Sequence, residues 1–286
     1  MMKKILITGG GGQLGSELKD LYQSRKDVKA IFVDREELAL DDIDGIIKVL
    51  HFYRPDVIIH GGAYTAVDAA ETEVGLADTV NHLASGEIAK YCKHNAAKLI
   101  AISTDYVFDG NSSVPLKESA EVSPINVYGA TKLKGEQAIQ ANLPEAIIIR
   151  TAWVYSVYGH NFVKTMIQLM NERDEISVIA DQIGSPTYAL DLAKAIVSVI
   201  DGEKWESGIY HFSNEGEVSW FDFAVAIKEI RGLDCVINAI PTSAYPTPAK
   251  RPKFSLLDKT KIKETFDLQI PFWKDSLIKM LAKFQL

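Results

Sequence analysis

Short runs of apolar residues alternate with amphipathic segments along the first half of the chain. The apolar runs predict strands at residues 4–8, 30–34, 57–60, 98–103, 146–150 and 176–180. The segments between them have helical periodicity and predict helices that include residues 14–21, 43–53, 75–95 and 128–141. Strands that are apolar throughout and separated by helices are typical of a parallel sheet covered on both faces. The pattern therefore predicts an α/β fold with a doubly wound, Rossmann-type parallel sheet.

The rhythm of strands and helices loosens after Arg150. The remaining pattern predicts, in order, helices at 161–172 and 190–201, a strand at 208–213, a helix at 220–231, a proline-rich loop at 241–252 and helical segments at 258–265 and 273–283. We expect a Rossmann domain over residues 1–150, to which segments around 176–201 return. A smaller, partly interwoven substrate-binding lobe is expected over residues 151–286.

A glycine-rich turn follows the first predicted strand and precedes the first predicted helix. It fits the pattern G-x-x-G-x-x-G, and such glycines allow a tight turn and close approach of a pyrophosphate to the backbone. The N-terminus of the following helix supplies N–H groups and a partial positive charge. A run of glycines alone is also compatible with a flexible loop, but its position between strand and helix favours a dinucleotide site. The residues expected to contact the cofactor here are Gly9, Gly12, Gln13, Leu14 and Gly15.

Residues after the next two strands bear on the identity of the cofactor. Asp34 ends the second strand and is placed to accept hydrogen bonds from the adenosine ribose, which favours NADH. Its neighbour Arg35 can instead pair with a 2′-phosphate, so we expect NADPH or NADH. Asp41 and Asp42 either face the adenine or cap the helix that starts at residue 43. The segment after the third strand begins with small residues that let the backbone lie along the dinucleotide, and it adds Ala63, Tyr64 and Thr65 to the candidate cofactor site.

Composition and charge narrow the class of protein. The chain has 286 residues, of which 47% are hydrophobic and 24% charged, as in ordinary soluble proteins. Its net charge is −7 and its Lys and Arg residues are scattered, so no nucleic-acid partner is expected. No run approaches the roughly 18 apolar residues that cross a bilayer, and the N-terminus lacks a signal-peptide pattern. We expect a cytoplasmic protein without a membrane partner. Cys92 and Cys235 have no metal-binding or redox spacing, and no metal site is expected.

Candidate chemistry lies at the end of the fourth strand and at the start of the helix 128–141. Thr104 can donate a hydrogen bond to a substrate carbonyl and stabilise the charge that develops there. Tyr128 and Lys132 are one helical turn apart, so both project from the same face. Tyr128 is expected to donate a proton, while Lys132 lowers the pKa of the phenol and holds the nicotinamide ribose. A Tyr-x-x-x-Lys pair occurs by chance in many helices, but together with the glycine turn and Thr104 it predicts a hydride-transfer enzyme.

Several longer motifs resemble a known family. They read Ala63-Tyr-Thr-Ala-Val-Asp-Ala-Ala-Glu71, Ser103-Thr-Asp-Tyr-Val-Phe-Asp-Gly110, Pro124-Ile-Asn-Val-Tyr-Gly-Ala-Thr-Lys132 and Asp181-Gln-Ile-Gly-Ser-Pro-Thr187. Shorter matches at residues 151–155, 161–162 and 251–252 extend the likeness over nearly the whole chain. The sequence resembles the extended short-chain dehydrogenase/reductase superfamily and, within it, the dTDP-4-dehydrorhamnose reductase family.

The resemblance implies roles for individual residues. The catalytic set would be Thr104, Tyr128 and Lys132, and the cofactor site would be the one described above. The sugar nucleotide would be held by Thr104, Asp105, Trp153, Asn161, Gln182 and Arg251. Core packing is an alternative for Trp153, and a solvated side chain is an alternative for Arg251. Some family members hold magnesium with carboxylates at a dimer interface. Here Glu17 matches one such position but Leu190 replaces another, so a monomer or a homodimer without a metal bridge is expected.

The resemblance also implies a reaction, the reduction of the 4-keto group of dTDP-4-dehydro-6-deoxy-L-mannose to dTDP-L-rhamnose with NADPH or NADH. A reductase or 4-epimerase of another nucleotide-4-keto-6-deoxyhexose is the main alternative. A 4,6-dehydratase is disfavoured because Asp105 is the one carboxylate beside Thr104, whereas that chemistry needs an acid/base pair. A non-catalytic regulatory subunit of the same fold is a further alternative, against which the intact set of Thr104, Tyr128 and Lys132 argues.

Overall fold

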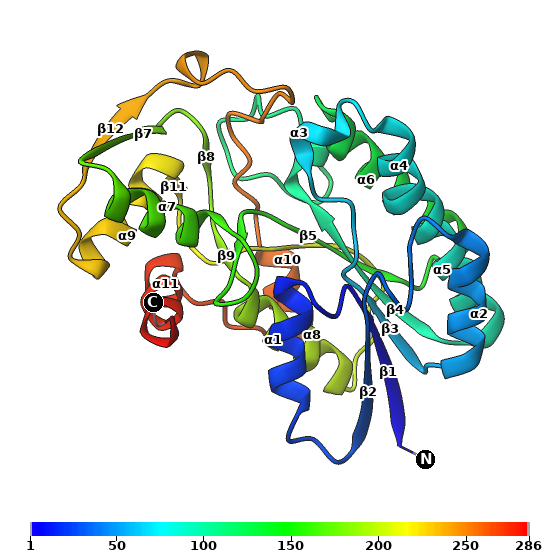
Figure 1. Cartoon of the computed structure of the whole chain (residues 1–286). Coiled ribbons are helices and arrows are strands. Elements are labelled where there is room, and N and C mark those ends of the chain that lie inside the picture. Colours follow the sequence, from blue (N-terminus) through cyan, green and yellow to red (C-terminus); the bar gives the residue numbers. More distant parts are fainter. Residues whose placement is uncertain (1, 285–286) are drawn as a thin grey trace.

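A six-stranded parallel sheet forms the centre of the larger part of the molecule (Figure 1). The structure is a computed structural model that describes residues 2–284. The strand order is β10-β5-β4-β3-β1-β2, and each neighbouring pair is parallel. The strands are β1 (Lys3–Thr8), β2 (Val28–Val33), β3 (Val57–His60), β4 (Lys98–Thr104), β5 (Ile147–Thr151) and β10 (Gly208–Phe212). This is the predicted doubly wound architecture.

Helices cover both faces of this sheet. The first face packs against α1 (Gln13–Tyr22) and α8 (Ala189–Asp201), through one apolar core that joins them to β1 and β5. The second face packs against α2 (Ile43–Tyr53), α5 (Ala84–Asn95) and α6 (Val127–Asn142). Burial of an aliphatic side chain in such a core contributes about 1.5–3 kcal/mol, which explains why the apolar runs of the sequence become central strands.

The predicted helix over residues 75–95 is divided in the structure. It consists of α4 (Val74–Asp78), a π-helical turn η1 (Thr79–Leu83) and α5, and the short α3 (Val67–Ala70) precedes it. Single π-helical turns inside α-helices are frequently found at functional sites. None of the helices within residues 2–284 is long and apolar enough to cross a membrane.

A smaller lobe lies beside the carboxyl ends of the central strands (Figure 1). Its core contains fully buried Phe223, Leu277 and Met280. Its helices are α7 (Phe162–Glu172), α9 (Trp220–Arg231) and α11 (Trp273–Lys283), whereas α10 (Thr260–Phe266) packs against β10 of the main sheet. Its short paired strands are β6 (Val154–Tyr155) with β9 (Thr187–Tyr188), β8 (Ile183–Gly184) with β11 (Val218–Ser219), and β7 (Glu175–Ile179) with β12 (Val236–Ile240).

Two strands lie in other sheets than the sequence predicts. Residues 176–180, expected in the central sheet, belong to β7, which pairs with β12 in the lobe. The segment 208–213, expected in the lobe, forms β10 and completes the central sheet beside β5. The burial patterns explain the exchange: β7 alternates buried and exposed residues, as in a strand covered on one face, whereas Tyr210, His211 and Phe212 are all buried. Helix α8 shares the apolar core of the first face with β1 and β5.

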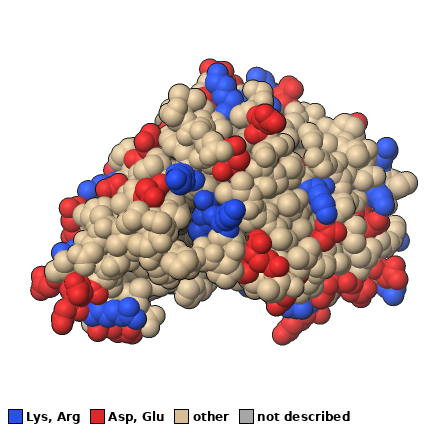
Figure 2. All heavy atoms as spheres, turned by 90° about the horizontal axis from the view of Figure 1, so that it is seen from above, with Lys and Arg blue, Asp and Glu red and all other residues tan. Residues whose placement is uncertain are grey.

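Side chains from outside the sheet protect its β10 edge. The backbone N–H of His211 donates to Glu118 Oε1 at 3.0 Å. Lys261 Nζ donates to the carbonyl of Ile209 at 2.7 Å. Covering an edge strand with charged side chains prevents another chain from pairing with it. Elsewhere, Figure 2 shows acidic and basic residues interspersed, with basic groups near the middle of the face seen from above.

Candidate active site

A cavity of about 820 Å³ lies at the carboxyl ends of the central strands, between the sheet and the lobe. Ligands of open parallel sheets bind at this end. The predicted site residues that line it are Gly9, Gly12, Gln13, Leu14, Asp34, Arg35, Asp41, Ala63, Tyr64, Thr65, Thr104, Asp105, Tyr128, Lys132 and Trp153. Gly15, Asp42, Asn161, Gln182 and Arg251 are not part of the lining. The fold thus brings segments that are far apart in the sequence to one place.

The glycine turn lines this cavity with backbone atoms that no side chain covers. Gly9 has φ +71°, and a Cβ there would lie 2.9 Å from the Cα of Gly62 after β3. A Cβ on Gly15 would lie 2.3 Å from the carbonyl oxygen of Gly9, so residue 15 supports the turn from behind. Gly12 is the N-cap of α1, whose first N–H groups have no capping side chain. Exposed N–H groups of a helix N-terminus beside bare backbone fit the pyrophosphate of NADPH or NADH.

The acidic residues after β2 divide between the cavity and the helix. Asp34 and Asp41 line the cavity, and Asp41 forms an ion pair with Arg35 at 3.4 Å. Asp42 instead caps α2, because its Oδ1 accepts the backbone N–H of Gly45 at 3.0 Å. Of the two alternatives for Asp42, the helix cap is therefore the one that the structure has.

Tyr128 and Lys132 project from the first turns of α6 into the cavity. Asn126 caps this helix by accepting the N–H of Gly129 at 2.7 Å. A Cβ on Gly129 would lie 2.1 Å from the carbonyl oxygen of Tyr106, so a glycine is required for the helix to approach the segment after β4 this closely. Lys132 Nζ donates to the carbonyl oxygen of Ile102 in β4 at 2.7 Å. These contacts fix the start of α6 against the end of β4.

The protonation of this pair differs from the sequence-based expectation. Burial raises the pKa of Tyr128 to about 12, and the Thr104 hydroxyl offsets only part of the rise. Burial lowers the pKa of Lys132 to about 8, against an opposing effect of Glu136. The pKa of the phenol is therefore raised rather than lowered, because desolvation by burial dominates. A lowering effect of Lys132 on this pKa stays a prediction.

Thr104 and Asp105 follow β4 and face the same cavity. The Thr104 hydroxyl donates to Asp105 Oδ1 at 3.1 Å. Asp105 is 2% exposed, and its Oδ2 has no hydrogen-bond partner within residues 2–284. Burial raises the pKa of this carboxyl group to about 6, although the hydroxyl groups of Ser255 and Thr104 oppose the rise. Because Asp105 lines the cavity, this buried oxygen is a candidate contact for a ligand.

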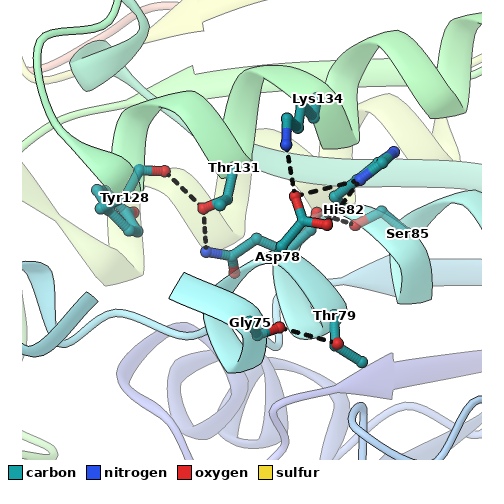
Figure 3. A network of polar contacts seen from close by, with 9 residues as sticks. Gly75, Asp78, Thr79, His82, Ser85, Tyr128, Thr131 and Lys134 are labelled. Atoms are coloured by element: carbon teal, nitrogen blue, oxygen red, sulfur yellow. Dashed lines mark hydrogen bonds and ion pairs between the residues drawn. The ribbon is translucent and has the colours of Figure 1, made fainter. Parts of the chain in front are cut away.

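A buried asparagine on the π-helical turn η1 connects the segment after β3 to helix α6. Asn81 Oδ1 accepts the N–H of Tyr64 at 2.9 Å, and its Nδ2 donates to Thr131 Oγ1 at 3.1 Å. Thr131 Oγ1 in turn donates to the carbonyl of Tyr128 at 2.9 Å (Figure 3). On the outer side of the same junction, Lys134 pairs with Asp78 at 2.9 Å (Figure 3). The π-helical turn thus places one side chain between the segment after β3 and the helix that carries Tyr128.

A histidine at the end of β3 extends this network to β1. His60 Nδ1 shares a hydrogen bond with Thr8 Oγ1 at 2.8 Å, and its Nε2 shares one with Ser85 Oγ at 3.1 Å. Ser85 Oγ donates to the carbonyl of Asn81 at 2.8 Å. Burial lowers the pKa of His60 to about 3, so the imidazole is neutral. His60 therefore links Thr8 of β1 to Ser85 of α5.

An ion pair is buried directly behind Lys132. Arg150 Nη2 lies 2.7 Å from Glu136 Oε2, its Nε donates to Glu136 Oε1 at 2.9 Å, and both side chains are at most 3% exposed. Ser103 donates to the same carboxylate. Glu136 is one turn after Lys132 on α6, and both line a second, very small cavity. The carboxylate therefore joins β4, β5 and the helix α6 that carries Tyr128 and Lys132.

Three residues predicted to hold the substrate bind other parts of the protein. Asn161 caps α7, and its Nδ2 donates to Gln13 Oε1 at 3.0 Å. Gln182 donates to Thr242 at 3.2 Å. Arg251 forms a two-pronged ion pair with Asp68, with nitrogen–oxygen distances of 3.1 and 2.7 Å. The structure does not bring these side chains to the cavity wall, and their substrate contacts stay predictions.

The comparisons with known proteins agree with one another. The profile of the family described as RmlD substrate binding domain matches residues 2–286. A dTDP-4-dehydrorhamnose reductase of Aggregatibacter actinomycetemcomitans is 42% identical, over 96% of this chain and 97% of that protein. The chain belongs to the dTDP-4-dehydrorhamnose reductase family. A reductase of the same name from Salmonella typhimurium is 40% identical, over 98% of this chain and 97% of its own.

Solved structures of dTDP-4-dehydrorhamnose reductases have the same fold. The crystal structure from Clostridium acetobutylicum has a TM-score of 0.94 and 40% identity, over 99% of this chain and 100% of that one. The structure from Bacillus anthracis in complex with NADP has a TM-score of 0.94 and 38% identity, with the same coverage. A UDP-glucose 4-epimerase from Thermus thermophilus has a TM-score of 0.81 at 18% identity, and this likeness concerns the fold alone.

The structure of this reductase-family member adds residues that the sequence analysis did not assign. Trp220 lines the cavity from α9, 67 positions after Trp153, and no spacing in the sequence relates the two. Asn81 lies on the π-helical turn η1 and Glu136 on α6, and a single polar residue in a helical segment gives no sign of burial. Within the described part of the chain, no group of three or more His, Cys, Asp or Glu residues is placed to hold a metal ion.

Proposed function

We propose that the protein reduces the 4-keto group of dTDP-4-dehydro-6-deoxy-L-mannose to the hydroxyl group of dTDP-L-rhamnose, with NADPH or NADH. The observation that carries this proposal is that Thr104, Tyr128 and Lys132 line one cavity together with the glycine turn. The membership in the reductase family supports the choice of substrate.

Three side chains have separate tasks in this reaction. The nicotinamide cofactor, when bound, supplies the hydride. Tyr128 donates a proton to the carbonyl oxygen of the sugar, and its raised pKa of about 12 keeps the phenol protonated at neutral pH. The Thr104 hydroxyl turns from Asp105 to the same oxygen and stabilises the charge that develops on it. Lys132, buried beneath the tyrosine, stabilises the phenolate left after the transfer as long as its ammonium group is charged.

Residues around the cavity would hold the two ligands. Gly9, Gly12, Gln13 and Leu14 at the start of α1 would bind the pyrophosphate, and Asp34, Arg35 and Asp41 the adenosine. The sugar would lie between Thr104, Asp105 and Trp153. In this proposal the substrate lobe consists of the parts of residues 151–286 that lie outside β10, α8 and α10. We further expect a cytoplasmic monomer or homodimer, which fractionation and sedimentation velocity distinguish from other states.

The product of the reaction tests this function. The purified protein is mixed with NADPH and with the 4-keto sugar nucleotide, which a 4,6-dehydratase and a 3,5-epimerase supply in the same vessel. Proton NMR of the isolated product is expected to show dTDP-L-rhamnose. Formation of the C4 epimer, or recovery of unreduced sugar despite cofactor binding, would contradict the proposal.

A further inference from the structure

Trp153 has a strained backbone at the cavity wall. It has φ +49°, in the left-handed region that residues with a large side chain rarely adopt. Its carbonyl oxygen accepts the N–H of Thr187 at 3.2 Å, which ties it to the lobe. Strain of this kind persists where the surrounding structure determines the conformation, and it is concentrated at functional sites. The contacts around Trp153 therefore determine its conformation.

Trp220 is the main support of this indole. The two ring systems stack with centroids 3.7 Å apart and an angle of 14° between their planes. Trp220 is held on its own side by Phe162, with centroids 4.6 Å apart. It is also the first residue of α9, whose N-terminus is fixed by a capping box between Ser219 and Asp222. Trp220 is thus part of a rigid element rather than of a loop.

Gly184 provides the space for the edge of the Trp153 indole. A Cβ on Gly184 would lie 3.0 Å from Cζ2 and 3.1 Å from Cε2 of Trp153. The indole is therefore confined by one ring that stacks on it and by one residue that has no side chain. Trp153 and Trp220 both line the cavity that holds Thr104 and Tyr128.

We propose that Trp220 is a positioning residue for the substrate: it holds Trp153 in place as the apolar wall on which the deoxyhexose ring of the nucleotide sugar packs. The proposal rests on the function given above. Sugar rings have apolar C–H faces, and aromatic side chains are the usual walls of pockets for such groups. Trp220 stacks on Trp153, which the proposed function assigns to the sugar, and it is not among the residues assigned to the cofactor. Its removal therefore weakens binding of the sugar and leaves cofactor binding unchanged.

Two variants of Trp220 and one control separate this role from general stability. Trp220→Ala removes the stacked ring, whereas Trp220→Phe keeps an aromatic face. Trp205→Phe is the matched control, because this tryptophan does not line the cavity and donates its Nε1–H to the carbonyl of Glu145 at 2.8 Å. For each protein we measure the exciton signal of stacked indoles by circular dichroism without ligands. We also measure KM for the 4-keto sugar nucleotide, and the affinities for dTDP-L-rhamnose and for NADPH by fluorescence titration.

We expect both Trp220 variants to lose the exciton signal and the control to keep it. Trp220→Ala is expected to raise KM for the sugar and weaken dTDP-L-rhamnose binding about 3- to 10-fold, the range typical of an aromatic pair. Its affinity for NADPH stays unchanged, and Trp220→Phe recovers most of the sugar affinity. Normal sugar binding by Trp220→Ala, or equal loss of sugar and NADPH binding, would refute the positioning role of Trp220 but leave the proposed function intact. A wild-type protein that neither binds nor reduces the sugar nucleotide would instead refute the proposed function, and the inference with it.

Discussion

Replacing Asp105 by asparagine is expected to make the protein more stable and less active. Asp105 Oδ2 is buried without a hydrogen-bond partner in the described structure, and its neighbour Oδ1 accepts the Thr104 hydroxyl. The Asp105→Asn side chain has the same shape and can still accept that hydrogen bond, but it cannot ionise. The substitution therefore removes a negative charge whose burial destabilises the free protein. Activity is expected to fall because this carboxylate lines the cavity beside Thr104.

The magnitude follows from the pKa of the carboxyl group. Burial raises this pKa from its usual value of 3.8 to about 6. A difference of roughly 2 in pKa corresponds to about 3 kcal/mol. The sign is fixed by protonation: well below pH 3.8 the carboxyl group is neutral in both the folded and the unfolded state, so its ionisation does not affect stability. Between pH 3.8 and about 6 the carboxyl group loses its proton in the unfolded state but keeps it in the folded state. The free energy of unfolding therefore falls across this range, by about 3 kcal/mol in total.

Thermal unfolding at two pH values tests this reasoning. Near pH 8, Asp105→Asn is expected to raise Tm by roughly 5–10 °C, and near pH 4 the difference from the wild type should nearly vanish. Asp191→Asn is the matched control, because Asp191 is also buried but accepts hydrogen bonds from Asn214 and Ser276 and does not line the cavity. The control is expected to gain no stability. An equal Tm of Asp105→Asn and wild type at pH 8 would refute the idea that the unpartnered carboxylate destabilises the fold.

The structure makes three further predictions. Glu136→Gln leaves Arg150 buried without its anion, so the free energy of unfolding should fall by about 3–5 kcal/mol in urea titrations, and an unchanged midpoint would contradict this. Lys132 loses its proton as the pH rises through about 8, so kcat should decline above that pH, whereas a constant kcat up to about pH 10 would show that its charge is not needed. Gly15→Ala places a Cβ 2.3 Å from the Gly9 carbonyl oxygen, so NADPH binding measured by fluorescence should weaken at least about tenfold while the far-UV spectrum stays native; undiminished binding would rule out a role of the turn.

The sequence was sufficient to predict those parts of the site that depend on neighbouring residues. The glycines of the first turn, the Thr104 strand end and the pair of Tyr128 and Lys132 each carry a local signal, because backbone conformation and helical spacing are encoded over a few positions. The central strands β1 to β5 were predictable for the same reason. Their apolar runs need burial on both faces, and the helices between them provide it.

The remaining features depend on contacts between distant segments. Nothing in the local pattern of β7 or β10 states which sheet each strand joins, since both are short and β-rich. Trp220 enters the site because α9, which packs against α7 and α11 in the lobe, places this residue against Trp153. The pKa of Tyr128 was predicted in the wrong direction because burial depends on the whole fold, whereas the spacing to Lys132 is local. Asn161 and Arg251 are held by Gln13 and Asp68, partners that no motif indicates.

The central claim is that Tyr128 gives its proton to a 4-keto sugar nucleotide in the cavity beside the glycine turn. The most direct test is the oxidation of NADPH, followed by its absorbance, with the wild type and with Tyr128→Phe. The wild type is expected to oxidise NADPH only when the 4-keto sugar nucleotide is present. The variant should bind NADPH with unchanged affinity and lose about 10²–10⁴-fold in kcat. A wild type that oxidises no NADPH with this sugar, or a phenylalanine variant that keeps the wild-type rate, would contradict the account.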